Sequence, residues 1–147
     1  MVVAPWADGP NMLRGMAELD YAYLADYAQI ENGKISALGA SYTHAVIETL
    51  PATWMTSIVG RVRSSEDEGP VVLRIEVNPP SDGYKMRFEG EVPKTSDMRP
   101  YRGKVGLLFT VTAQIPMAET GLYTFDVFVN DEHARRLAFE VEVDEKS

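Results

Sequence analysis

The sequence predicts an all-β protein, a single antiparallel β-sandwich of about eight strands. Apolar and polar residues alternate over six successive segments between Trp54 and Asp144, which is typical of strands that bury one face. Clusters rich in Gly, Pro, Asn and Asp separate these segments at regular intervals, as expected for a sandwich. With 147 residues, the chain is long enough for one domain made of two packed sheets.

Residues 1–17 are expected to form an irregular arm in front of a sandwich domain at 18–147. Gly and Pro residues interrupt this segment often enough to prevent a long regular element. The segment is nevertheless too apolar for an ordinary disordered tail. The sequence leaves contact with its own domain or with a partner open. The candidate contact residues are Val2, Val3, Trp6, Met12 and Leu13.

The region after the arm gives a mixed signal. Residues 18–24 fit a strand and residues 25–29 fit a single helical turn. Asn32 and Gly33 form a strong turn signal, because both residues tolerate a positive φ. A second strand is expected over 34–47, with a possible bulge at its central Gly-Ala pair.

Six clearer strands follow in the rest of the chain. The second and third of them should form a hairpin, because Ser81-Asp82-Gly83 turns the chain between them. The longest irregular connection is 93–103, and a loop of this length inside a compact domain is often a binding element. The six strands are expected near residues 54–63, 71–77, 84–92, 107–115, 123–129 and 137–143.

The segment Glu119-Thr-Gly-Leu-Tyr-Thr-Phe resembles the tyrosine corner of immunoglobulin-like and fibronectin-like sandwiches. The resemblance implies an immunoglobulin-like sandwich. It also implies a structural role for Tyr123, whose hydroxyl would bond back to nearby backbone. The chain has no cysteine and so lacks the paired cysteines of antibody domains. Only the wider sandwich class is therefore implied.

A second resemblance rests on three short motifs near the start and on the Gly-x-Tyr-x-Phe strand. The motifs are Leu24-Ala-Asp-Tyr-Ala, Asn32-Gly-Lys and Leu38-Gly39. Together they are similar to a family of small uncharacterised bacterial and phage proteins, over about residues 20–143. The resemblance implies the fold and no activity, because no function is attached to the family pattern.

The sequence contains no catalytic, cofactor-binding or metal-binding signature. It lacks a nucleophile elbow, a phosphate-binding glycine loop and a dinucleotide fingerprint. Neither His44 nor His133 has the spacing of a metal site, and the acidic run at 66–68 lacks the ligand pattern of a calcium loop. The sequence therefore predicts a protein that is not an enzyme and that binds no cofactor and no metal.

A formal net charge of −8 argues against general affinity for nucleic acid. Glutamates are interleaved with the outward-facing cations of three strands, so cross-strand charge pairing is expected. These cations are Arg61, Arg63, Arg74, Lys85 and Arg87. No apolar run approaches the ~18 residues of a membrane span, and the first residues lack the basic start of a secretion signal. We expect no nucleic-acid or membrane partner, and a location in the cytoplasm or in a virion.

Two outward-facing apolar residues, Leu108 and Phe128, break the alternation on strands that are expected to be central. If both lie on one sheet, they form an apolar patch of the kind that marks an interface. The alternative is that the arm covers them. With the arm, they predict a non-catalytic structural or assembly module that acts through protein–protein contacts. A phage virion structural or decoration protein that binds protein partners or symmetry-related copies fits this description.

The alternative function is a soluble ligand-binding sandwich that uses the 93–103 loop. In this hypothesis the loop presents an aromatic and cationic rim to an anionic or planar ligand. The rim residues are Met98, Arg99, Tyr101 and Arg102.

Overall fold

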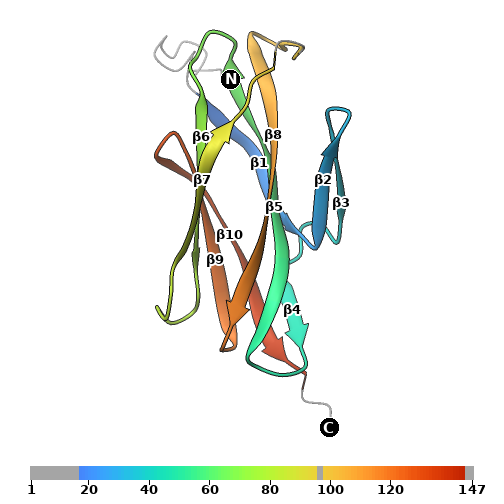
Figure 1. The fold of residues 1–147 in the computed structure, drawn as a ribbon, viewed down its shortest axis with the longest axis vertical. Coiled ribbons are helices and arrows are strands. Elements are labelled where there is room, and N and C mark those ends of the chain that lie inside the picture. The colour runs from blue at the N-terminus through green and yellow to red at the C-terminus, as the bar shows by residue number, and fades with distance from the viewer. Residues whose placement is uncertain (1–16, 96–97, 145–147) are drawn as a thin grey trace, which may run out of the picture.

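The computed structural model describes residues 17–95 and 98–144 of the chain. This part contains ten strands and no helix (Figure 1). The all-β sandwich prediction is confirmed, with ten strands instead of about eight. The strands are β1 (Glu18–Ala25), β2 (Tyr27–Glu31), β3 (Lys34–Leu38), β4 (His44–Ile47), β5 (Ala52–Ser65), β6 (Val71–Asn78), β7 (Met86–Val92), β8 (Lys104–Met117), β9 (Gly121–Val129) and β10 (Glu132–Val143).

One layer of the sandwich is a three-stranded antiparallel sheet with the order β1-β5-β8. Its two longest strands, β5 and β8, have 14 residues each. They pair along their whole length, from Ala52 opposite Met117 to Ser65 opposite Lys104. Because of this continuous pairing, β5 and β8 form a long antiparallel ladder, and the second layer packs against it.

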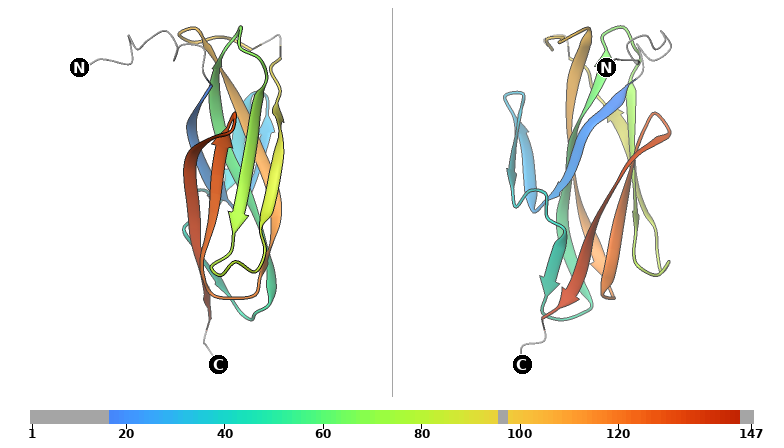
Figure 2. Two further views of the ribbon diagram at one scale, coloured as in Figure 1. Left: turned by 90° about the vertical axis from the view of Figure 1, so that its left-hand side faces the viewer. Right: turned by 180° about the vertical axis from the view of Figure 1, so that it is seen from behind.

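The other layer is a five-stranded sheet with the order β4-β10-β9-β6-β7. Figure 2 shows the two sheets packed face to face, with β2 and β3 standing apart as a hairpin. The prediction of a purely antiparallel fold is wrong at one place, because β4 pairs in parallel with β10. The chain enters this sheet as β4 and crosses to the other sheet as β5, so β4 lies at an edge beside the last strand.

The core between the sheets is centred on aromatic rings. Tyr123, Phe125 and Phe139 are fully buried, and the ring centroid of Phe139 lies 5.7 Å from each of the other two. Tyr42 packs on the same ring at 5.5 Å. Aromatic pairs at such distances add stabilisation beyond the area that they bury. This cluster ties the turn before β4 to the centre of the five-stranded sheet.

The tyrosine corner predicted from the sequence is present. The Tyr123 hydroxyl donates a hydrogen bond of 2.9 Å to the backbone carbonyl of Glu119, four residues upstream. Gly121 between them has a φ of 125°, a conformation that favours glycine. Burial raises the pKa of the Tyr123 hydroxyl, which keeps it protonated as the donor.

Two predictions for the first half of the chain are wrong. Residues 25–29 form no helical turn, because β2 pairs with β3 around the Asn32–Gly33 turn. The single strand over 34–47 breaks after Leu38, where Gly39 has a φ of 62°. A Cβ on Gly39 would lie 2.1 Å from a carboxylate oxygen of Asp26, so a larger residue would clash with it.

The hairpin of β2 and β3 packs on the outer face of the three-stranded sheet. Ala25, Ala28 and Val59 form a small second core there, and all three are buried. Ile35 and Ala37 of β3 pack against this core. Both faces of β5 are therefore covered near Val59, although the alternation pattern predicts a solvent-exposed outer face.

We expect Tyr123→Phe to lower the free energy of unfolding by about 1–2 kcal/mol, because it removes a buried hydroxyl and leaves a carbonyl without its donor. Urea unfolding followed by circular dichroism measures the change. Tyr27→Phe is the matched control, because the Tyr27 hydroxyl bonds only to exposed Gln29 at 3.3 Å. Equal unfolding midpoints for the two variants would contradict the structural role of Tyr123.

Candidate functional site

The most open part of the sandwich lies between β7 and β8. Among the described residues, β7 pairs only with β6 and β8 pairs only with β5, so each strand has one free edge. Both edges lie on the same side of the molecule (Figure 1). Between them runs a groove with a volume of about 680 Å³.

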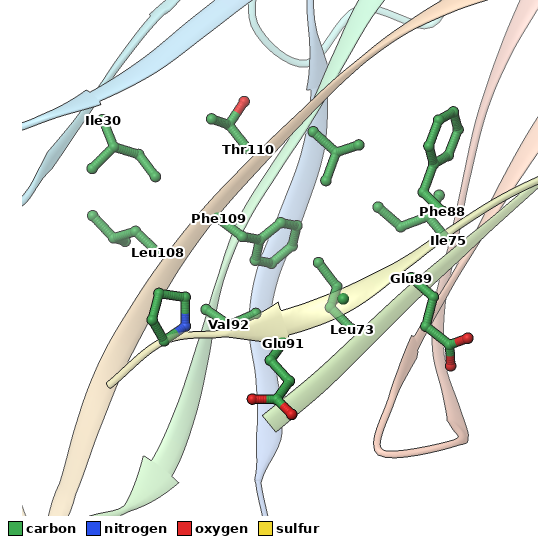
Figure 3. Close-up of a pocket in the computed structure, with 13 residues that line it drawn as sticks. Ile30, Leu73, Ile75, Phe88, Glu89, Glu91, Val92, Leu108, Phe109 and Thr110 are labelled. Carbon is green, nitrogen blue, oxygen red and sulfur yellow. The ribbon is translucent and has the colours of Figure 1, made fainter. Parts of the chain in front are cut away.

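Apolar side chains from both sheets line this groove (Figure 3). Leu73 and Ile75 of β6 lie opposite Phe109 of β8, and Phe88 and Val92 come from β7. The remaining lining residues are Ile30, Glu89, Gly90, Glu91, Pro93, Leu108, Thr110 and Val111. The groove is therefore an opening into the hydrophobic core, with two carboxylates on the β7 side.

Gly90 keeps the groove open. It pairs with Leu73, whose side chain is buried in the core, so position 90 faces the interior of the sandwich. A Cβ built on Gly90 would meet no atom within 4 Å. The flanking inward positions on β7 carry Phe88 and Val92, and the absent side chain between them leaves room for a group from outside.

Thr110 places an unsatisfied polar group in the wall of the groove. Its hydroxyl oxygen is buried and has no hydrogen-bond partner among the described residues. Thr110 lies on β8 near Leu108 and Ile30 (Figure 3). Thr110 alternates along β8 with the core residue Phe109, so its side chain lies on the outer face of the three-stranded sheet, where a buried hydroxyl without a partner costs free energy.

The two outward-facing apolar residues predicted to form one patch are on different sheets. Leu108 is on β8 and lies at the rim of the groove. Phe128 is on β9 of the five-stranded sheet, where the Arg74 guanidinium lies 4.0 Å from its ring centroid. The condition for a joint patch, that both residues lie on one sheet, is therefore not met; alternation indicates the side of a strand and does not assign a sheet. The arm residues Val2, Val3, Trp6, Met12 and Leu13 lie outside the described residues.

The 93–103 loop forms part of a second hollow, on the outer face of the three-stranded sheet. Arg99 and Tyr101 line it together with Arg61, Arg63 and Lys104, and its volume is about 450 Å³. The sequence places Arg61 and Arg63 beside the cations of β6 and β7, and this prediction is wrong because β5 belongs to the other sheet.

The four residues expected at the rim of the loop do not all lie at the hollow. Met98 packs against the core, so it does not join Arg99 and Tyr101 at the hollow. The Arg102 guanidinium lies over the Tyr101 ring, 5.7 Å from its centroid. Tyr101 is exposed, and the loop therefore presents an aromatic ring between cations, without the methionine.

A buried carboxylate, that of Asp126, lies on the outer face of the five-stranded sheet. Arg136 donates two hydrogen bonds of 2.9 Å to it, and His133 Nε2 lies 2.8 Å from Oδ1. These contacts, with Arg136 the largest contributor, lower the pKa of Asp126. The Asp126 carboxylate on β9 thus has two partners on β10, and these contacts link the two strands.

The described residues contain no group of three or more His, Cys, Asp or Glu side chains arranged to hold a metal ion. They also contain no helix with the length and apolar character that crossing a membrane requires. His44 is exposed on β4.

We expect Asp126→Asn to lower the free energy of unfolding at pH 7 by roughly 1 kcal/mol, because the charged hydrogen bonds to Arg136 are weakened. The folded-state pKa is below the unfolded value, so the carboxylate stabilises the fold above about pH 4 and this contribution is lost as the pH falls through the folded-state pKa. Urea unfolding at pH 7 and at about pH 3 measures this effect. The difference in the free energy of unfolding between wild type and variant should be smaller at the lower pH.

The control for this prediction is Asp67→Asn, which changes an exposed loop carboxylate. It should leave the stability nearly unchanged at both pH values. If the difference in the free energy of unfolding between wild type and Asp126→Asn stays the same in acid, the proposed role of the ionised Asp126 carboxylate is contradicted.

A structure of the Pseudomonas fluorescens alkylpurine DNA glycosylase AlkC, bound to DNA containing an abasic site analog, is similar to this chain with a TM-score of 0.45 and 9% sequence identity. The match covers 86% of this chain and 30% of that chain, so this chain spans less than a third of the glycosylase. A likeness at this level carries no functional argument. No curated protein matches the chain.

The sequence pattern of one protein family matches residues 20–142, which is most of the chain. The match agrees with the coarser part of the resemblance stated above, that of an uncharacterised family. This chain belongs to a family of unknown function, DUF6941.

Proposed function

We propose that this protein is a non-catalytic assembly module and that the groove between β7 and β8 is its contact surface. The proposed occupant is an extended segment, residues 2–16 of a neighbouring copy of the chain. The observation that carries this proposal is the pair of free strand edges on either side of an apolar groove of about 680 Å³.

A free strand edge offers a row of backbone donors and acceptors to another strand. Strand addition satisfies these groups, and alternate side chains of the added segment enter the space between the sheets. The opening at Gly90 lies along this path. The groove therefore has the features that favour an inserted strand.

The position of Ala17 supports residues 2–16 as the occupant. The Ala17 amide donates to the Glu68 carboxylate at 3.0 Å, and the Lys94 ammonium group donates to the Glu68 backbone carbonyl at 2.6 Å. Lys94 follows Pro93, which lines the groove. The chain thus enters the described part next to the end of the groove.

The length and composition of the segment fit the same site. Fifteen residues can span ~50 Å when extended, which is enough to reach from one copy to the next. Val2, Val3 and Trp6 are apolar, as are Met12 and Leu13 further along. Exchange of this segment between copies would join them through backbone pairing and apolar burial. A location in the cytoplasm or in a phage virion stays a prediction.

We expect deletion of residues 2–16 to abolish self-association and to leave a folded domain, because the strands and the core lie after Ala17. Light scattering coupled to size-exclusion chromatography measures the oligomeric state, and circular dichroism checks the fold. A synthetic peptide of residues 2–16 should bind the truncated protein. A monomeric full-length protein would contradict exchange between copies, even if the peptide binds.

We expect Gly90→Leu to block binding of the 2–16 peptide and assembly of the full chain. The leucine side chain would occupy the open space in the groove and should not lower the melting temperature, because no atom lies within 4 Å of the new Cβ. Gly69→Leu is the matched control: it also adds a side chain in open space, but in the loop outside the groove. Normal assembly of a folded Gly90→Leu protein would exclude the groove as the contact surface.

A further inference from the structure

The hollow on the outer face of the three-stranded sheet gathers cations on an acidic protein. Arg61, Arg63, Arg99 and Lys104 all line it, and the chain as a whole has a net charge of −8. Elsewhere on the described surface some cations pair with carboxylates, as Arg74 and Lys85 both do with Glu76. A concentration of positive charge at one place therefore needs an explanation other than average surface composition.

Two of the guanidinium groups are held in fixed positions. Arg61 donates to the Asp20 carboxylate with an Nε–Oδ2 distance of 2.7 Å and lies 5.3 Å from the ring centroid of Tyr21. Arg63 donates to the backbone carbonyl of Tyr101 and lies 5.2 Å from the centroid of its ring. Their planar donor groups are thus oriented before any ligand arrives, which reduces the entropy lost on binding.

A glycine makes the space for these arginines. Gly106 on β8 pairs with Arg63 on β5 and lines the hollow. A Cβ at this position would lie 3.1 Å from Cδ of Arg61, tighter than an ordinary contact. The absence of a side chain at position 106 leaves the hollow open between the strands and the loop.

Among the described residues that line the hollow, the cations outnumber the carboxylates. Asp20 lies beside Arg61, and the Glu18 carboxylate lies 3.2 Å from the Lys104 ammonium group. Arg99 in particular has no hydrogen bond or ion pair with any residue in 17–95 or 98–144. Like charges brought together raise the electrostatic energy, and a bound anion would offset this cost.

We propose that this hollow binds the phosphate group of a small organic phosphate monoester. A phosphate monoester carries close to two negative charges at neutral pH, which suits a hollow lined by several cations. Guanidinium groups bind phosphate oxygens through paired donors, and Lys104 adds a point charge. A volume of about 450 Å³ exceeds that of a phosphate group alone, so an organic group fits beside the exposed ring of Tyr101.

A titration followed by NMR tests this proposal with phenyl phosphate as the probe. Benzoate, which has a similar ring and a single charge, is the comparison ligand, and the ionic strength is held constant. We expect saturable shifts of the backbone amides of Tyr101, Lys104 and Gly106 with phenyl phosphate, and binding of benzoate that is at least ~10-fold weaker. Absence of saturable shifts, or equal affinity for the two ligands, would overturn the proposal.

Substitutions distinguish binding of phenyl phosphate in the hollow from general electrostatic attraction to the protein. Arg99→Gln should weaken phenyl phosphate binding ~10-fold, because one charged hydrogen-bond donor is removed from an exposed loop position. Arg63→Gln should have an effect of at least the same size. Arg87→Gln is the control, because it removes the same charge from β7 on the other sheet, where Arg87 pairs with Glu89. Equal losses in all three variants would show attraction by net charge only and would overturn the site.

The result of the phenyl phosphate experiment does not depend on the assembly proposal. The hollow is formed by the outer face of the three-stranded sheet and the 93–103 loop, whereas the proposed strand enters between the two sheets. The chain without residues 2–16 retains every described residue that lines the hollow and should bind phenyl phosphate with unchanged affinity. Loss of binding in that folded variant would overturn the assignment of the hollow as the complete site.

Discussion

Two sheets that do not close on each other impose the main constraint on this molecule. The three-stranded sheet ends at β8 and the five-stranded sheet ends at β7, and both unpaired edges lie on the same side. Backbone groups on a free edge must bond to water or to another strand, so a protein has to cover such an edge or use it. The apolar lining and the missing side chain at Gly90 both occur at this one place. For this reason we assign the contact function to the groove.

The outer faces of the two sheets differ in the arrangement of their charged side chains. On the five-stranded sheet several charged side chains pair with one another, and Asp126 is bonded by both Arg136 and His133. On the three-stranded sheet the hairpin of β2 and β3 covers one part of the face, and cations gather beside it. The same acidic chain therefore has one balanced face and one local excess of positive charge. The difference gives the second hollow its electrostatic character.

Local pattern predicted many elements correctly because their causes are local. Alternation from Trp54 onwards predicted the long strands, and positive-φ residues predicted the turn at Asn32–Gly33. The resemblance of the motif before Tyr123 to a tyrosine corner predicted a bond from its hydroxyl to nearby backbone, which is present. The helical turn expected at 25–29 failed because β2 is stabilised by pairing with β3 and by packing on Val59. A five-residue strand has too little sequence signal of its own to reveal such contacts.

The sequence by itself determined the class of fold, the strand faces and the candidate residues of the 93–103 loop. Side-chain periodicity follows directly from backbone geometry, so it can be read without knowing which strands are neighbours. Only the tertiary structure decided the sheet to which each strand belongs. That assignment separated Leu108 from Phe128, brought Arg61 and Arg63 to the loop, and placed the β7 and β8 edges on either side of a groove. These contacts join residues far apart in the chain, and their free energy depends on the packing of both sheets together.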